Sequence, residues 1–174
     1  MKQHIRRRSR SVAVVVALIL VAATAGACEP SAATHFDAKV SRVVDGDTIV
    51  VQFDDGTTDK VRLLGIDTPE THKPGTAVQC YGPEAEQFTR AQLSGRSVRL
   101  ELDAEERDKY HRLLAYVYVD GRRFEDELLR RGLAKVLIIA PNGRHAKSMI
   151  AVEIAAKSQD VGMWGACPAT ASKR

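Results

Sequence analysis

The 174-residue sequence lacks an apolar run long enough to cross a bilayer comfortably, and it lacks the Cys/His spacing of a zinc site. Its longest apolar run, residues 12–23, is too short for a membrane span, and no other segment comes closer. An internal repeat and a low-complexity tract are also absent, which excludes a repeat array. The length indicates one domain of ordinary size plus some extra sequence.

The apolar run lies in a basic N-terminal segment that is typical of an export signal. Small residues follow the run up to Ala27, and five basic residues precede it: Lys2, Arg6, Arg7, Arg8 and Arg10. We interpret residues 1–27 as an export signal peptide and expect an exported protein. Removing those five charges from the formal net charge of +4 leaves a mature chain near −1. Any polyanion binding must therefore come from local placement of Arg and Lys.

Three cysteines complete the picture of an exported chain. Cys28 follows Ala-Gly-Ala at 25–27, which resembles a lipoprotein processing box, whereas plain cleavage around Ala-x-Ala would give a secreted protein. A cell-surface lipoprotein, touching the membrane only through lipidated Cys28, and a freely secreted monomer both stay open. Residues 28–35 are interpreted as a linker. Cys80 and Cys167 make an even pair, which outside the cytosol predicts a disulfide rather than a metal site.

Hydrophobic patterning predicts five strands and three helices in residues 36–168. Val- and Ile-rich segments with interleaved polar residues predict strands at 36–44, 48–53, 60–66, 97–102 and 113–119. Helices are predicted from Pro83 to Gly95, over 124–132 and over about 144–159. On the last helix we expect a buried face of Met149, Ile150, Ile154 and Ala155. This order predicts a β-barrel plus α fold, a five-stranded OB-fold barrel with three helices, followed by a flexible tail at 169–174.

Carboxylates recur at the predicted strand ends. "DGDT" at 45–48 reads equally well as an ordinary turn, since Asp and Gly are turn formers. Asp47 gains a second interpretation because "IDTPE" places Asp67 and Glu70 at another strand end, and adjacent antiparallel strands can bring such ends together. Converging hard oxygens are the ligands of Ca²⁺ or Mg²⁺.

Two arginines accompany these carboxylates. Arg62 lies five residues before Asp67, and Arg112 begins another predicted strand. Singly, each arginine is as well explained by a solvated surface ion pair. Beside a metal, however, two guanidinium groups match the charge and geometry of a phosphate.

These stretches resemble the staphylococcal nuclease (thermonuclease) family. The matching segments are "VVDGDT", "VRLLGIDTPE", "YGPEA", "DKYHRLLAYVY" and "RRGLAKV", which occur in family order between about Phe36 and Trp164. The resemblance implies an OB-fold barrel with three helices and a Ca²⁺-dependent phosphodiesterase that acts on DNA and RNA.

The resemblance also implies a role for each matching residue. Asp47, Asp67 and the Thr68 carbonyl would hold calcium, and Glu70 would activate or position the attacking water. Arg62 and Arg112 would bind the scissile phosphate and stabilise its developing charge. Lys109 and Tyr110 match positions that contact a terminal phosphate.

Several residues depart from the family or attract another interpretation. His111 stands where the family often has glycine, and 137–140 (Leu-Ile-Ile-Ala) stands where related nucleases often carry base-contacting tyrosines. His72 and His145 are predicted to be surface histidines, because neither has a companion nucleophile. The charged run 103–109 is predicted to be a solvated loop.

The sequence thus predicts a nuclease and leaves two alternatives. One is a catalytically silent OB-type module that binds nucleic acid or protein, which would be expected to have lost one or more of Asp47, Arg62, Asp67, Glu70 and Arg112, although all five are present. The other is an envelope lipoprotein with a structural role, which rests on Cys28 alone and does not conflict with nuclease activity.

Overall fold

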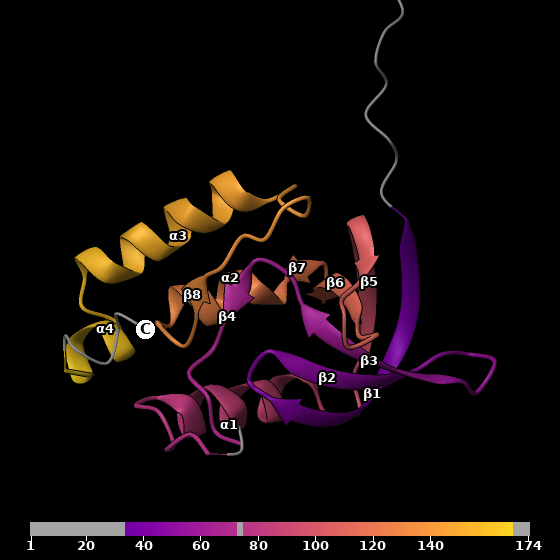
Figure 1. Ribbon diagram of the computed structural model, residues 1–174, viewed down its shortest axis with the longest axis horizontal. Helices are drawn as coiled ribbons and strands as arrows, with labels where there is room; N and C mark the ends of the chain where they lie inside the picture. Colours follow the sequence, from indigo (N-terminus) through magenta and orange to yellow (C-terminus); the bar gives the residue numbers. More distant parts are fainter. Residues whose placement is uncertain (1–33, 73–74, 169–174) are drawn as a thin grey trace, which may run out of the picture. The chain divides into compact units, whose positions relative to one another are not determined.

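The computed structural model describes residues 34–72 and 75–168 (Figure 1). All of them belong to one compact unit, 32–174. The predicted signal peptide, Cys28 and the tail at 169–174 lie outside the described residues. Across the described ranges, no helix is both long and apolar enough to span a membrane.

Five strands close into a barrel, which confirms the predicted fold class. They are β1 (His35–Asp45), β2 (Thr48–Gln52), β3 (Thr58–Leu63), β5 (Ser97–Arg107) and β6 (Leu113–Val119). Antiparallel pairing gives the order β3-β2-β1-β5-β6, and a short parallel pairing of β3 with β6 closes the sheet. β7 (Arg122–Arg123) adds to β6, while β4 (Ile66–Asp67) pairs with β8 (Lys135–Val136) in a separate two-stranded sheet.

Alternation along the strands explains why the barrel forms. On β2 and β3, the side chains of Ile49, Val51, Val61 and Leu63 are fully buried, and they alternate with more exposed neighbours. Because successive side chains point to opposite faces, the apolar set fills the barrel and the polar set remains outside. Polar residues near the strand ends can therefore build a site without disturbing the core.

Two predicted boundaries were wrong. The third strand ends at Leu63 rather than at residue 66, because Gly65, with φ +77°, turns the chain before β4 begins. β5 continues to Arg107, so most of the predicted solvated loop 103–109 is strand. A register shift between Leu102 and Arg107 leaves its charged residues largely exposed, which gives this stretch a loop-like sequence.

Four helices flank the barrel in the described part of the chain, one more than predicted. They are α1 (Gly82–Leu93), α2 (Phe124–Arg130), α3 (Ala146–Ser158) and α4 (Met163–Ala166). α1 carries Pro83 in its first turn, as expected. α2 lies between α1 and α3 in Figure 1, with Phe124 stacked on Phe88 of α1.

The predicted buried face of α3 was wrong in three of its four residues. Met149 is fully buried, whereas Ile150 and Ile154 are 42% and 59% exposed and Ala155 is exposed. Glu153 is buried instead, because its Oε1 accepts a hydrogen bond of 2.9 Å from the Val136 N–H. The face of α3 that packs against the protein is therefore the one that carries Glu153, and the isoleucines lie on the exposed side.

A disulfide between Cys80 and Cys167 joins the segment before α1 to the end of α4. The two Cα atoms lie 5.9 Å apart, and 87 residues separate the cysteines in sequence. The end of the described chain is thereby tied to the loop between β4 and α1.

Candidate active site

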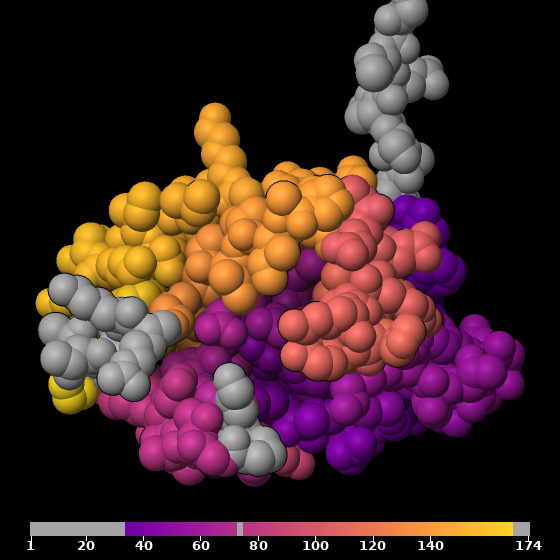
Figure 2. Space-filling view, in the orientation of Figure 1, coloured from indigo at the N-terminus to yellow at the C-terminus, as the bar shows by residue number. Residues whose placement is uncertain are grey.

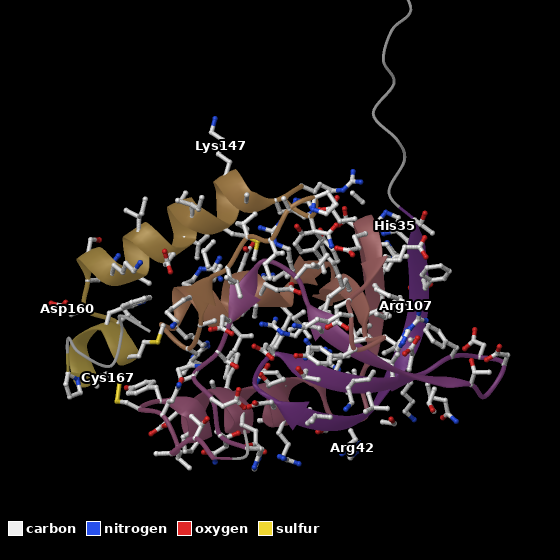
Figure 3. The ribbon with its side chains drawn as sticks, in the orientation of Figure 1. His35, Arg42, Arg107, Lys147, Asp160 and Cys167 are labelled. Atoms are coloured by element: carbon white, nitrogen blue, oxygen red, sulfur yellow. A yellow bond between two sulfur atoms is a disulfide. The ribbon has the colours of Figure 1, made fainter. Side chains whose placement is uncertain are left out.

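Carboxylates and guanidinium groups from separate elements line one cavity of about 460 Å³. Its walls include Asp47, Arg62, Asp67, Glu70 and Arg112, all five of them predicted site residues. Tyr110 also lines the cavity, whereas Lys109 does not, although its Nζ lies 5.1 Å from the centre of the Tyr110 ring. Figure 3 draws the side chains of the described residues without labelling those that line the cavity, and Figure 1 labels the strands near which they lie.

Strand pairing explains why these residues meet. Asp45 at the end of β1 is paired with Thr48, which is paired in turn with Arg62 on β3. The Leu63 N–H donates a hydrogen bond of 2.9 Å to the Asp47 carbonyl, which fixes the turn against β3. Asp67 ends β4 opposite Lys135 of β8, so a second small sheet delivers it to the same place.

Arg62 lies between the two predicted metal-binding aspartates. Its Nη2 is 3.0 Å from Asp47 Oδ2 and 3.4 Å from Asp67 Oδ1. The Thr68 N–H donates to Asp47 Oδ2 over 3.1 Å, and Thr68 itself is buried. Since Arg62 also donates to the Leu63 carbonyl over 2.6 Å, its guanidinium is held in a fixed position at the wall of the cavity.

Two of the carboxyl groups that line the cavity, those of Asp67 and Glu70, have a raised pKa. Burial raises the pKa of Asp67, and the negative charge of Asp47 raises it further, against the opposing effect of Arg62 and Lys135. Burial likewise raises the pKa of Glu70, to which the neighbouring Asp45 and Asp47 carboxylates add. The site therefore concentrates more negative charge than Arg62 neutralises.

Asp45 is a lining residue that the sequence analysis did not single out. Its Oδ1 accepts hydrogen bonds from the Gly46 N–H (2.8 Å) and from Thr71 Oγ1 (3.0 Å), and its carboxylate contributes to the raised pKa of Glu70. Its place in "DGDT", two residues before Asp47, was the available signal. It was overlooked because Asp is an ordinary turn former.

Arg112 is oriented by its own turn. Asp108 accepts hydrogen bonds from Arg112 Nε (2.7 Å) and from the Arg112 backbone N–H (3.0 Å). His111, just before it, has φ +62°, in the left-handed region where glycine is favoured. Since the backbone conformation is nevertheless maintained, His111 in place of glycine does not prevent Arg112 from lining the cavity.

His72 and His145 differ in how far their side chains are exposed. His72 has a 63% exposed side chain, in line with a surface histidine, and lines the cavity while contacting Glu86 at 2.9 Å. His145 was predicted wrongly: its side chain is only 24% exposed, and its Nε2 lies 3.1 Å from the buried Glu101. This contact lies outside the described lining of the candidate site, and it anchors the start of α3.

The segment that replaces the family's tyrosines does not reach the cavity. β8 ends at Val136, so residues 137–140 lie in irregular chain beyond it. Leu137, Ile138 and Ile139 are 40%, 37% and 65% exposed, and none of them lines the cavity.

The donor set suits a hard divalent cation. Asp47, Asp67 and Glu70 offer only oxygen, which Ca²⁺ and Mg²⁺ prefer. A bound cation would also relieve the repulsion between neighbouring carboxylates that helps to raise the pKa of Asp67 and Glu70. In the arrangement seen across residues 34–72 and 75–168, no three Asp, Glu, His or Cys side chains converge closely enough to enclose an ion. Arg62 instead neutralises Asp47 and Asp67.

Comparison with known proteins gives a consistent result. Residues 60–166 match the family described as staphylococcal nuclease homologue. The thermonuclease of Staphylococcus hyicus is 42% identical over 126 residues, which cover 72% of this chain and 74% of that protein. The SPbeta prophage-derived endonuclease YokF of Bacillus subtilis is 44% identical over 130 residues, 74% of this chain and 44% of the relative. Endonuclease YncB of Bacillus subtilis is 42% identical over 127 residues, 72% of this chain and 60% of the relative. The barrel, the residues around its cavity and these relatives agree, and the chain belongs to the staphylococcal nuclease family.

Proposed function

We propose that this protein is a calcium-dependent nuclease that hydrolyses phosphodiester bonds of DNA and RNA with little sequence specificity. The observation that carries the proposal is a single cavity lined by Asp47, Arg62, Asp67, Glu70 and Arg112. Relatives named thermonuclease and endonuclease support the same reaction class. A silent binding module would not need this complete set of charged groups.

The two arginines are assigned to the phosphate. Arg62 is rigidly held by Asp47 and the Leu63 carbonyl, and Arg112 by Asp108. A guanidinium group can donate two parallel hydrogen bonds to a phosphate, which positions it and stabilises the charge that develops during hydrolysis. Lys109 and Tyr110, close to Arg112 in the same turn, are assigned to a further phosphate of the substrate.

Glu70 is assigned to the attacking water. Its raised pKa, caused first by burial and then by Asp45 and Asp47, makes its carboxylate a better proton acceptor than an ordinary surface glutamate. Asp47, Asp67 and the Thr68 carbonyl are the residues that would hold calcium. The chemistry that a bound calcium ion supplies is charge neutralisation and polarisation of the phosphate.

We further propose that the protein acts outside the cytoplasm. Residues 1–27 carry the pattern of an export signal, and Cys28 is placed for lipidation after cleavage. A surface-anchored or secreted monomer would meet DNA and RNA in its surroundings. Metabolic labelling with a radioactive fatty acid, compared between the natural chain and Cys28→Ala, separates the anchored form from the secreted form.

The test of the activity is digestion of single-stranded DNA, double-stranded DNA and RNA by the purified protein, with calcium and with a chelator. We expect all three to be degraded with calcium and none with the chelator. Undiminished digestion in the chelator would contradict the calcium assignment, and no digestion under either condition would contradict the nuclease assignment.

A further inference from the structure

Lys60 lies at the edge of the cavity and is not one of the residues assigned above. It lines the cavity together with Arg62, two residues further along β3. Side chains two apart on a strand share a face, about 6.6 Å apart along the chain. Lys60 is exposed, and no ion pair within the described part of the chain involves it. Its charge is therefore available to a ligand that extends beyond the cavity.

A second cation, Arg42, continues this direction, and it too has no ion pair with the residues that the structure describes. Lys60 is paired across the sheet with Val50, and Val50 is paired with Arg42 on β1. Directly paired residues point to the same face of a sheet, and neighbouring strands lie about 4.8 Å apart. The Cα atoms of Arg42 and Lys60 are therefore roughly 10 Å apart, and both side chains lie on the outer face of the barrel. Arg42 is exposed and points away from the sheet (Figure 3).

The face between these cations lacks negative charge. The pairing of β2 with β3 places six residues on it, none of them acidic: Thr48, Val50, Gln52, Thr58, Lys60 and Arg62. The carboxylates of the site are instead at one end, where Asp45 and Asp47 meet the cavity. Figure 2 shows the indigo and purple surface of these strands beside the salmon surface of the β5–β6 connection.

A row of cations that begins in the cavity with Arg62 and continues outward through Lys60 to Arg42 suits a chain of repeating phosphates. We infer that Lys60 and Arg42 form an accessory track that binds the backbone phosphates of a nucleic-acid strand where it leaves the cavity. The inference rests on the proposed function, and it deepens it by naming two residues outside the assigned set that bind the substrate strand. Because a track of this kind contacts phosphates and no bases, it adds affinity without sequence preference.

The test is binding of a fluorescently labelled, long single-stranded oligonucleotide in the presence of a chelator, measured by anisotropy over a series of salt concentrations. Hydrolysis is not needed for this readout, so it separates failure of the track from failure of the nuclease assignment. The variants are Lys60→Gln, Arg42→Gln and their combination. Lys147→Gln is the matched control, because Lys147 carries the same charge and points outward from α3, on the side of the view opposite Arg42 (Figure 3).

We expect each single variant to weaken binding about threefold at low salt. Each should reduce the slope of log affinity against log salt by about 0.7, and the combination by about twice as much. In the calcium-activated reaction, the ratio of KM for the long oligonucleotide to KM for a dinucleoside monophosphate should rise with Lys60→Gln. Equal slopes for Lys60→Gln, Lys147→Gln and the natural protein would overturn the inference, as would an equal change of KM for both substrates.

Discussion

Glu125 on α2 gives the most quantitative prediction about stability. Its side chain is fully buried, its Oε1 accepts a hydrogen bond of 2.9 Å from the Val117 N–H, and its Oε2 has no hydrogen-bond partner in the described structure. Burial raises the pKa of Glu125 to about 8, from an ordinary value of 4.5. The carboxyl group is therefore protonated in the folded protein at neutral pH.

The sign of the pH dependence follows from proton binding. Between the ordinary pKa of 4.5 and the folded pKa of about 8, the folded protein holds a proton on Glu125 that the unfolded chain has released. The contribution of Glu125 to the free energy of unfolding is fully present below pH 4.5 and is lost as the pH rises toward 8. From pH 5 to pH 8 the loss amounts to roughly 3 kcal/mol.

The substitution Glu125→Gln isolates this effect, because glutamine resembles a protonated glutamate and does not titrate. Urea unfolding of both proteins near pH 5 and near pH 8 gives the difference between their free energies of unfolding at each pH. We expect that difference to shift by roughly 3 kcal/mol in favour of Glu125→Gln as the pH rises. Glu84→Gln, an exposed site in the first turn of α1, is the control. A difference that stays constant over this range would refute the reasoning.

Three further predictions concern local structure. Gly46→Ala should lower the free energy of unfolding by about 1–3 kcal/mol in urea denaturation, because a Cβ there would lie 2.8 Å from Thr68 Oγ1. An unchanged midpoint would show that Thr68 moves freely. His111→Gly should raise the free energy of unfolding by up to about 1 kcal/mol, since it relieves φ +62°, and a lowered melting temperature would contradict this. Replacing Cys80 and Cys167 by alanine should lower the free energy of unfolding by about 2–5 kcal/mol, given their separation of 87 residues, and two free thiols in the natural protein, purified without reductant and examined by mass spectrometry, would contradict this expectation.

The fold was largely predictable, because period-two alternation and turn residues encode the strands. The failures have physical causes. β5 extends through a charged, exposed stretch, and its pairing with β6 is irregular between Leu102 and Arg107. Because these side chains do not alternate between buried and exposed, the sequence pattern does not indicate a strand there. On α3, Glu153 is buried and accepts a hydrogen bond from a β8 amide, a contact that depends on tertiary structure.

The candidate site was predictable to a similar extent. Asp47 and Asp67 line the same cavity, but not through pairing of adjacent antiparallel strands, because Asp67 ends β4, which pairs with β8 in a separate sheet. Asp45 was missed because a turn explains it equally well. His145 was misread because its partner Glu101 lies 44 residues away in sequence, so nothing local to His145 reveals the contact. The catalytic roles themselves remain predictions.

The most direct test of the central claim is the rate of DNA hydrolysis at saturating calcium and substrate for Glu70→Gln against the natural protein. Glu84→Gln is the matched control, since it makes the same change at an exposed position of α1. We predict that Glu70→Gln folds, as judged by circular dichroism, and hydrolyses DNA about 10²–10⁴-fold more slowly, because it cannot accept a proton from water. Glu84→Gln should retain the natural rate. A folded Glu70→Gln protein with the natural rate would contradict the claim that this cavity is the active site of a nuclease.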